Sequence, residues 1–161
     1  MELSQEFKTN YGSIRGFSDQ DIGWLFLDMI AEDREDARRA GYGDNYVKMV
    51  VDTVFTSEIA LSIVNSEGAL VTCFGVSAAA EEGVGVMWGF STNKYHKHDN
   101  LSAVFKIGEH TKCVLDFFHD IFPVIQASVL VENRSARRRM RFAGFRMSGI
   151  SDGRALYIRH R

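Results

Sequence analysis

Three short apolar runs, at residues 59–64, 69–77 and 84–91, follow one another with only a few polar residues between them. Each gap ends in glycine, with the sequence Ser-Glu-Gly at 66–68 and Glu-Glu-Gly at 81–83. Apolar runs this short, separated by turn signals, are typical of antiparallel hairpins. The middle of the chain therefore predicts a three-stranded meander, and the rest of the fold has to be built around it.

Two helices are expected before the meander. Ser18 suits the N-cap of the first helix, because Asp21, three residues further on, can return a hydrogen bond to the cap amide. Apolar residues then recur at helical spacing, and the helix is expected to continue through the charged run 32–39 and to stop near Gly41. Asp44 is the expected cap of the second helix.

After the meander the spacing of apolar residues becomes helical again. A polar loop at 92–100 leads into a long helix that Pro123 ends, because proline cannot donate a hydrogen bond to the helix ladder. A strand, a helix capped by Asn133 and two last strands follow. The expected bounds are 12–17 for an opening strand, 101–122 for the long helix, and 124–131, 133–142, 145–150 and 155–160 for the elements after it.

The predicted order is β-α-α-β-β-β-α-β-α-β-β. A meander that feeds a crossover helix and a further strand implies a mixed sheet. The predicted fold class is therefore α/β, with one mixed central sheet and helices on both faces. At 161 residues the chain fits a single domain over 1–161, with residues 1–11 as a flexible N-terminal extension.

Charge is distributed unevenly along the chain, although the net charge is only −2. Residues 134–161 carry nine arginines and one acid, Asp152, whereas residues 1–133 carry 10 basic and 20 acidic residues. A basic C-terminal segment on an acidic body suggests an anionic ligand at one end of the molecule.

Cysteine and histidine patterns exclude several classes of protein. Cys73 and Cys113 lie in apolar runs without Cys-x-x-Cys spacing, so both are expected in the core rather than in a disulfide or zinc site. No third ligand is apparent for His96 and His98, and no metal is predicted. The polar start and the lack of a run of about 20 apolar residues predict a cytoplasmic protein without a membrane partner.

One stretch carries a recognisable motif, Asn133-x-x-Ala136-x-x-x-Met140-x-x-x-Gly144-Phe145. It resembles the segment Asn-x-x-Ala-x-x-x-Tyr-x-x-x-Gly-Phe of the GCN5-related N-acetyltransferase (GNAT) superfamily. The GNAT fold also has the order of elements predicted above, so the resemblance extends over residues 13–160.

The resemblance implies an acyl-CoA-dependent N-acyltransferase, in which acetyl passes directly from acetyl-CoA to an amine of a protein or small molecule. In GNAT enzymes the pantetheine arm pairs like an extra strand with the strand that corresponds to 84–91, and its amides polarise the thioester. Gly85 and Gly89 would let a ligand approach that strand. The implied cofactor-binding residues are Gly89, Phe90, Ser91, Thr92, Lys94, Lys97, Asn133, Arg137 and Arg138.

The chemistry expected of such an enzyme requires a base and a proton donor. Glu132 is the candidate general base, and Ser135 is a candidate donor to the leaving thiolate.

Two features of the sequence depart from the pattern of the GNAT superfamily. The stretch 93–101 has no glycine, although GNAT enzymes bind pyrophosphate on a glycine-rich loop at a helix N-terminus, so cationic side chains would have to replace it. Met140 stands where many members have a proton-donating tyrosine.

Several features have a second interpretation. The arginines within 134–141 suit CoA phosphates, nucleic acid or a solvated face, and nucleic acid is the least favoured of the three. For Asn133 a plain helix cap is favoured over a bond to a pantetheine amide, because asparagine is a leading cap residue. The acidic run 32–36 suits either a solvated helix end or the recognition of a cationic amine.

The alternative function is a catalytically degenerate GNAT-like scaffold that acts by binding a host protein. The charged run 32–39 and the strand 87–92 look like those of short GNAT-like proteins encoded by tailed bacteriophages, which would place the protein in the host cytoplasm. The two departures at 93–101 and Met140 favour this alternative, whereas Asn133 and the glycines of the strand favour the enzyme. The expected state is a monomer or a homodimer.

Overall fold

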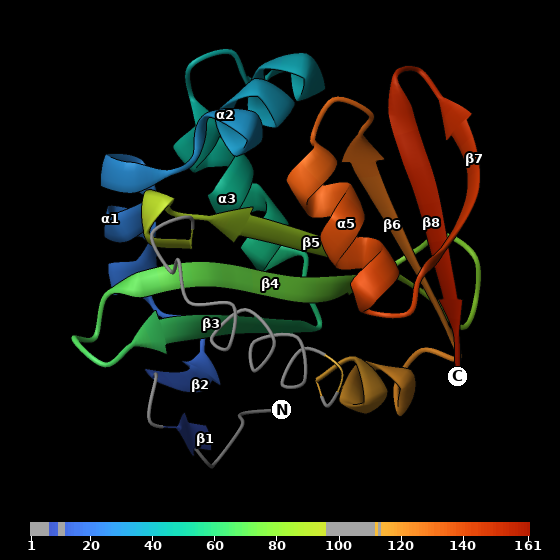
Figure 1. Ribbon diagram of the computed structural model, residues 1–161, viewed down its shortest axis with the longest axis horizontal. Helices are drawn as coiled ribbons and strands as arrows, with labels where there is room; N and C mark the ends of the chain where they lie inside the picture. The colour runs from blue at the N-terminus through green and yellow to red at the C-terminus, as the bar shows by residue number, and fades with distance from the viewer. Residues whose placement is uncertain (1–6, 10–11, 96–111, 113) are drawn as a thin grey trace. The chain divides into compact units, whose positions relative to one another are not determined.

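The computed structural model of the chain describes residues 7–9, 12–95, 112 and 114–161 (Figure 1). The strands are β1 (Phe7–Thr9), β2 (Gly12–Gly16), β3 (Ile59–Asn65), β4 (Leu70–Ala78), β5 (Val84–Ser91), β6 (Val124–Leu130), β7 (Arg146–Ser151) and β8 (Arg154–His160). The helices are α1 (Asp19–Asp28), α2 (Ala31–Ala37), α3 (Tyr46–Phe55) and α5 (Arg134–Phe142), with a π-helical turn η1 (Arg38–Tyr42) and a 3-10 turn η2 (Asn93–Tyr95).

Within the described residues, the strands form one eight-stranded sheet in the order β1-β2-β3-β4-β5-β6-β8-β7. β5 and β6 are parallel, whereas β1–β2, β2–β3, β6–β8 and β7–β8 are antiparallel. The predicted α/β class with a mixed sheet is therefore confirmed.

The chain forms two compact units, residues 1–75 with 89–99 and residues 76–88 with 100–161, so β4 and β5 contribute to both.

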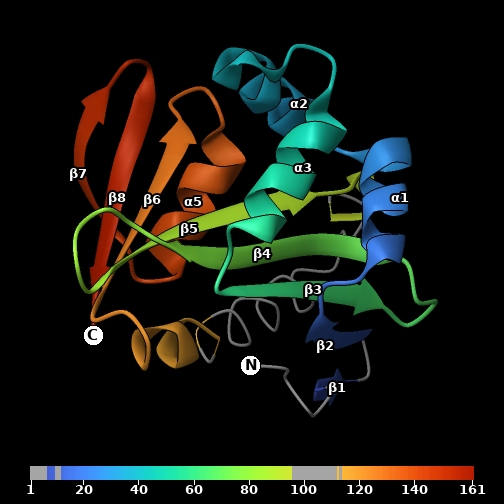
Figure 2. The same cartoon turned by 180° about the vertical axis from the view of Figure 1, so that it is seen from behind.

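The first unit contains β1, β2, β3, most of β4 and the end of β5. α1 and α3 lie side by side over one face of β3 and β4 (Figure 2). β1 pairs with β2 in the register Phe7↔Ile14 to Thr9↔Gly12. Residues 7–9, within the extension predicted for 1–11, pair with β2 and cover the edge that β2 would otherwise leave open.

The first predicted helix is divided in two, which corrects the continuous helix expected from Ser18 to near Gly41. α1 ends at Asp28, and Met29 and Ile30 are extended, with ψ of 136° and 152°. Both side chains are buried, at 1% and 2% exposure. The break occurs because these two residues bond to the end of β5, and this tertiary pairing outweighs their helical periodicity. The helical segment still ends where expected, at Gly41 with φ of 90°.

The cap of α3 is also corrected. Asn45 rather than Asp44 is the N-cap, and its Oδ1 accepts a hydrogen bond from the Lys48 amide at 3.3 Å. Asparagine and aspartate have the same capping chemistry, so the sequence does not distinguish two adjacent candidates.

The second unit contains the start of β5, the parallel strand β6 and the β7–β8 hairpin. Val84–Met87 pair in register with Val124–Ala127. The hairpin turns through Asp152 and Gly153, with φ of 50° and 73°, as the two-residue turn of a tight hairpin requires. The long helix predicted over 101–122 lies mostly outside the described residues. The part of that range that the structure describes is helical over 114–119. No helix in the described part of the chain is long and apolar enough to span a bilayer.

Candidate functional site

The end of β5, from Gly89 to Thr92, is the segment expected to meet the cofactor. The hydrogen bonds of this segment to β4 show to which edge of β5 the backbone groups of each residue point. The Thr92 amide donates to the Val71 carbonyl at 3.0 Å, and the Phe90 carbonyl accepts from Thr72 Oγ1 at 3.0 Å. Because backbone groups of successive strand residues point to opposite edges, those of Gly89 and Ser91 point away from β4.

Both backbone groups of Ser91 have partners from the chain itself. The amide donates to Oδ2 of Asp33 at 2.7 Å, and the carbonyl accepts from the Ile30 amide at 3.0 Å. Met29 and Thr92 form an antiparallel bridge beside them. Ser91 is 2% exposed and Thr92 is fully buried. The outer edge of β5 is therefore already paired at Ser91.

Asp33 and the Met29–Ile30 segment were missed by the sequence analysis. The strand 84–91 has no carboxylate of its own, and Asp33 reaches Ser91 from the first turn of α2. The available signal was weak. Met29 and Ile30 continue the apolar face of α1, so their pattern indicated helix and hid the extended segment that brings Asp33 to the strand.

The two glycines of β5 differ, and one expectation about them is wrong. A Cβ added to Gly85 would lie 2.6 Å from Cγ2 of Val76 and 2.7 Å from Cδ2 of Phe122, so Gly85 packs against core side chains and leaves no room for a ligand. A Cβ added to Gly89 would lie 3.4 Å from the Cys73 carbonyl oxygen, an ordinary contact, and Gly89 is exposed. Only Gly89 offers an approachable backbone.

The η2 turn after β5 is held by contacts with the end of α1. Nδ2 of Asn93 donates to the backbone oxygen of Asp28 at 3.2 Å and to its Oδ1 at 3.0 Å. Nζ of Lys94 lies 5.3 Å from the centroid of the Trp24 ring, a cation–π distance. Lys94 thus lies against α1, whereas Lys97, His96 and His98 lie outside the described residues.

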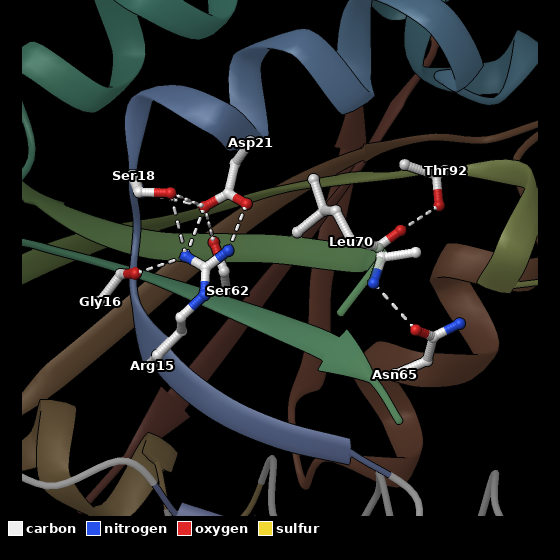
Figure 3. Close-up of polar contacts among 9 residues, drawn as sticks. Arg15, Gly16, Ser18, Asp21, Ser62, Asn65, Leu70 and Thr92 are labelled. Atoms are coloured by element: carbon white, nitrogen blue, oxygen red, sulfur yellow. Dashed lines mark hydrogen bonds and ion pairs between the residues drawn. The ribbon is translucent and has the colours of Figure 1, made fainter. Parts of the chain in front are cut away.

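A buried ion pair anchors α1 and thereby the segment that follows it (Figure 3). Asp21 is fully buried and accepts two bonds from Arg15, Nη1 to Oδ2 at 2.8 Å and Nη2 to Oδ1 at 2.7 Å. Oγ of Ser62 and the amide of Ser18 also donate to Oδ2, at 2.7 and 2.9 Å. The second of these bonds is the return bond predicted for a capping box. Together they tie α1 to β2 and β3.

The same contacts set the charge of Asp21. Burial by itself would raise the pKa of the carboxyl, but the hydrogen bonds from Arg15, Ser18 and Ser62, with the charge of Arg15, hold the pKa below its ordinary value of 3.8. Asp21 is thus an ionised structural group whose hydrogen-bonding capacity is used.

The other predicted site residues lie at the start of α5, in the second unit. Asn133 is the N-cap, as expected, and its Oδ1 accepts from the Ala136 amide at 3.0 Å. Nη1 of Arg137 donates to the Val131 carbonyl at 3.1 Å, and its Nε lies 3.4 Å from the Tyr157 hydroxyl. The exposed side chains in this group are Glu132, Ser135 and Arg138.

Cys73 has no features of a nucleophile. It is fully buried in β4, as predicted. Burial raises the pKa of its thiol well above the ordinary value of 9.0, and the carboxylates of Asp21 and Asp33 raise it further. Cys113 lies outside the described residues. Among those residues, no three His, Cys, Asp or Glu side chains gather as metal ligands would.

The fold is shared with solved acetyltransferases. A GNAT-family acetyltransferase from Bacillus anthracis matches with a TM-score of 0.68 and 16% identity, over 97% of this chain and 98% of that one. A ribosomal-protein-S5-alanine acetyltransferase from Vibrio fischeri gives 0.64 and 11%, over 98% and 97%. An acetyltransferase from Agrobacterium tumefaciens gives 0.63 and 13%, over 100% and 98%.

These matches show that the chain has the GNAT fold, which confirms the fold that the motif around Asn133 implied. No family model matches the sequence, and a search among curated proteins finds no significant match. At such low identities the likeness establishes the fold alone, so activity has to be argued from the residues of this chain.

Proposed function

We propose that this protein is a cytoplasmic acyl-CoA-dependent N-acyltransferase, which transfers acetyl from acetyl-CoA to an amine. The observation that carries the proposal is the course of β5. Its described ladder with the parallel strand β6 covers Val84–Met87, and the strand then continues to Gly89, exposed and without a side chain, and to Ser91. A strand edge of this kind is what an extended ligand needs in order to pair with the backbone.

The fit of acetyl-CoA to this edge is incomplete in the described conformation. Gly89 meets the requirement for an approachable backbone. Ser91 does not, because its amide and carbonyl bond to Asp33 and Ile30. Acetyl-CoA would supply the activated acyl group as a thioester, and its pantetheine arm fits along Gly89–Thr92 only where those two bonds are released.

Cationic side chains are the proposed holders of the CoA phosphates, because the stretch 93–101 has no glycine to form an amide nest. Arg138 is exposed, and no hydrogen bond or ion pair is found for its guanidinium in the described part of the chain. Arg137 has a structural task at Val131, so we assign phosphate binding chiefly to Arg138, Lys94 and Lys97. Asn133 uses Oδ1 for the cap, which leaves its amide nitrogen to meet a pantetheine carbonyl.

Removal of the amine proton requires a base, and protonation of the thiolate requires a donor. Glu132 is retained as a proposed base and Ser135 as a proposed donor, since both side chains are exposed at the start of α5. The acidic side chains near α2 favour a cationic amine as acceptor.

The test is direct binding of acetyl-CoA by calorimetry, together with release of CoA in the presence of a panel of amines and peptides. Met140 offers a matched pair of variants, because Met140→Tyr adds a phenol and Met140→Phe adds the same ring without its hydroxyl. If water alone protonates the thiolate in the wild type, Met140→Tyr should raise turnover by up to about 10²–10⁴-fold, while Met140→Phe should not. No binding and no release by any of these proteins would reject the proposal.

The paired state of Ser91 favours a second function. With its outer edge covered by Ile30 and Asp33, β5 would have lost its ligand and the GNAT fold would serve as a scaffold that binds a protein. If the chain is encoded by a phage, that partner is a host protein. Absence of acetyl-CoA binding even after Asp33 is removed would favour this function over the enzyme.

A further inference from the structure

We infer that the segment Met29–Asp33 is an internal competitor of acyl-CoA, which occupies the Ser91 edge of β5 and has to leave before the ligand can pair there. This inference rests on the proposed function. A strand residue points its one amide donor and its one carbonyl acceptor to a single edge, and a ligand that pairs there needs both. At Ser91 the donor bonds to Asp33 at 2.7 Å and the acceptor bonds to Ile30 at 3.0 Å.

The direction of these bonds makes the competition specific. Thr92 bonds to β4 through Val71, so the groups of Ser91 point to the opposite edge. The backbone groups of Gly89, an exposed residue, point to this same edge. Met29 adds an isolated antiparallel bridge to Thr92, so Met29 and Ile30 lie along the strand end. The chain thus imitates an extended ligand at this position.

The competing contact is a strong one. The Asp33 carboxylate accepts from the amide as a charged group, and such bonds are shorter and stronger than those between neutral groups. Met29 and Ile30 are buried at 1% and 2% exposure, so the paired segment also excludes water from the edge. A ligand has to replace both the charged acceptor and the amide donor before it binds.

The elements on either side of Met29–Asp33 allow this segment to move away from the end of β5. On one side, α1 is anchored through Asp21 to β2 and β3. On the other side, α2 passes into η1, where Gly41 and Gly43 have φ of 90° and 59°. The backbone therefore leaves the helical conformation before α2, at Met29–Ile30, and again within η1, at Gly41. A shift of α2 between these two points would release Asp33 without disturbing the anchor of α1.

The consequence is a lowered apparent affinity in the free protein. When only a fraction of molecules has an open edge, the apparent dissociation constant rises in inverse proportion to that fraction. Any partner that draws α2 away would raise the affinity for acyl-CoA, and a cationic acceptor that binds the Asp33 carboxylate has the chemistry to do so.

The experiment compares acetyl-CoA binding by the wild type, Asp33→Ala and the matched control Glu32→Ala, which removes a neighbouring exposed carboxylate of the same helix. Calorimetry gives the affinity, and hydrogen exchange of the Ser91 amide reports whether the edge has opened. We expect Asp33→Ala to bind at least about tenfold more tightly and its Ser91 amide to exchange faster, since the amide loses its acceptor. Glu32→Ala should behave as the wild type in both measurements.

Asp33→Asn is the second variant, because its amide oxygen can still accept from Ser91 and so preserves the segment should Asp33→Ala be unstable. It should give an intermediate affinity, since a neutral acceptor competes less well than a carboxylate. Equal or weaker binding by both Asp33 variants, alongside measurable binding by the wild type, would overturn the competition and leave the proposed function standing. No binding by any of the proteins would overturn both.

Discussion

Oδ2 of Asp33 accepts a hydrogen bond from the backbone amide of Ser91 at 2.7 Å, although the two residues lie 58 positions apart in the sequence. This contact joins the first turn of α2 to the end of β5. The bonds of Met29 and Ile30 to the same strand end hold those two residues out of the helical conformation. Together these contacts decide whether the strand end is open to an extended ligand. The backbone amide of Ser91 therefore matters both for the fold of this region and for the proposed binding of the ligand.

Stability is expected to depend strongly on Asp21. Asp21→Asn keeps the shape of the side chain but leaves the Arg15 guanidinium, 27% exposed, without its carboxylate. Allowing for that partial exposure, we expect a loss of about 2–4 kcal/mol in the free energy of unfolding. Urea denaturation measures the loss. The control is Asp19→Asn, an exposed carboxylate of the same helix turn, which should change stability by less than about 0.5 kcal/mol. Equal effects of the two variants would contradict the anchoring role.

The contribution of Asp21 should also depend on pH. The pKa of its carboxyl is lower in the folded protein than its ordinary value of 3.8. Its stabilisation is therefore fully present above that ordinary value and is lost as the pH falls through the folded pKa. The difference in unfolding free energy between wild type and Asp21→Asn should be constant above about pH 5 and shrink below about pH 4. A difference that stays constant down to pH 3 would show that the charge is not responsible.

The two glycines of β5 should respond differently to a methyl group. Gly85→Ala places a Cβ 2.6 Å from Val76 and 2.7 Å from Phe122, so overpacking is expected to cost about 1–3 kcal/mol. Gly89→Ala places its Cβ at an ordinary 3.4 Å from the Cys73 carbonyl oxygen and should leave stability nearly unchanged. Thermal unfolding of the two variants compares them directly. A marked loss of thermal stability in Gly89→Ala would mean that the backbone of β5 at Gly89 is packed against other residues and is not approachable.

A larger residue at position 89 tests the ligand edge itself. Gly89→Val should fold, because the position is exposed, yet weaken binding of acetyl-CoA by putting a branched side chain beside the backbone that the ligand pairs with. Calorimetry on the folded variant gives the affinity. Unchanged affinity would place the ligand elsewhere on the molecule.

Arg137 and Arg138 are adjacent in α5 but have different roles. Arg137→Ala removes the bond to the Val131 carbonyl and should lower stability by about 1 kcal/mol. Arg138→Ala should leave stability unchanged, weaken CoA binding and make the remaining affinity less dependent on salt. If Arg138→Ala instead abolishes binding to nucleic acid and spares CoA, the basic helix serves a polyanion. If neither ligand responds, Arg138 belongs to a solvated face.

Much of the fold could be predicted from local patterns. The hairpin signals at 66–68 and 81–83 and the cap at Asn133 each depend on nearby residues, and each lies where the pattern indicated. The break at Met29–Ile30 could not be predicted in this way, because a distant strand end holds these residues and helical periodicity contains no information about it.

The candidate site was harder to predict than the fold. Motif matching located the end of β5 and the start of α5, but it assumed an open strand edge. Gly85 and Gly89 look alike in sequence, and only packing shows that Phe122 fills the space beside the first. Asp33 was missed because a carboxylate that meets a backbone amide across the fold has no sequence signature of its own.

The most direct test of the central claim follows the backbone amides of wild type and Asp33→Ala while acetyl-CoA is added. With both proteins isotopically labelled for nuclear magnetic resonance, the account predicts saturable shifts of the amide signals of Gly89–Thr92, at lower concentrations in Asp33→Ala. Shifts that bypass Gly89–Thr92, or no shifts in either protein at millimolar acetyl-CoA, would contradict it.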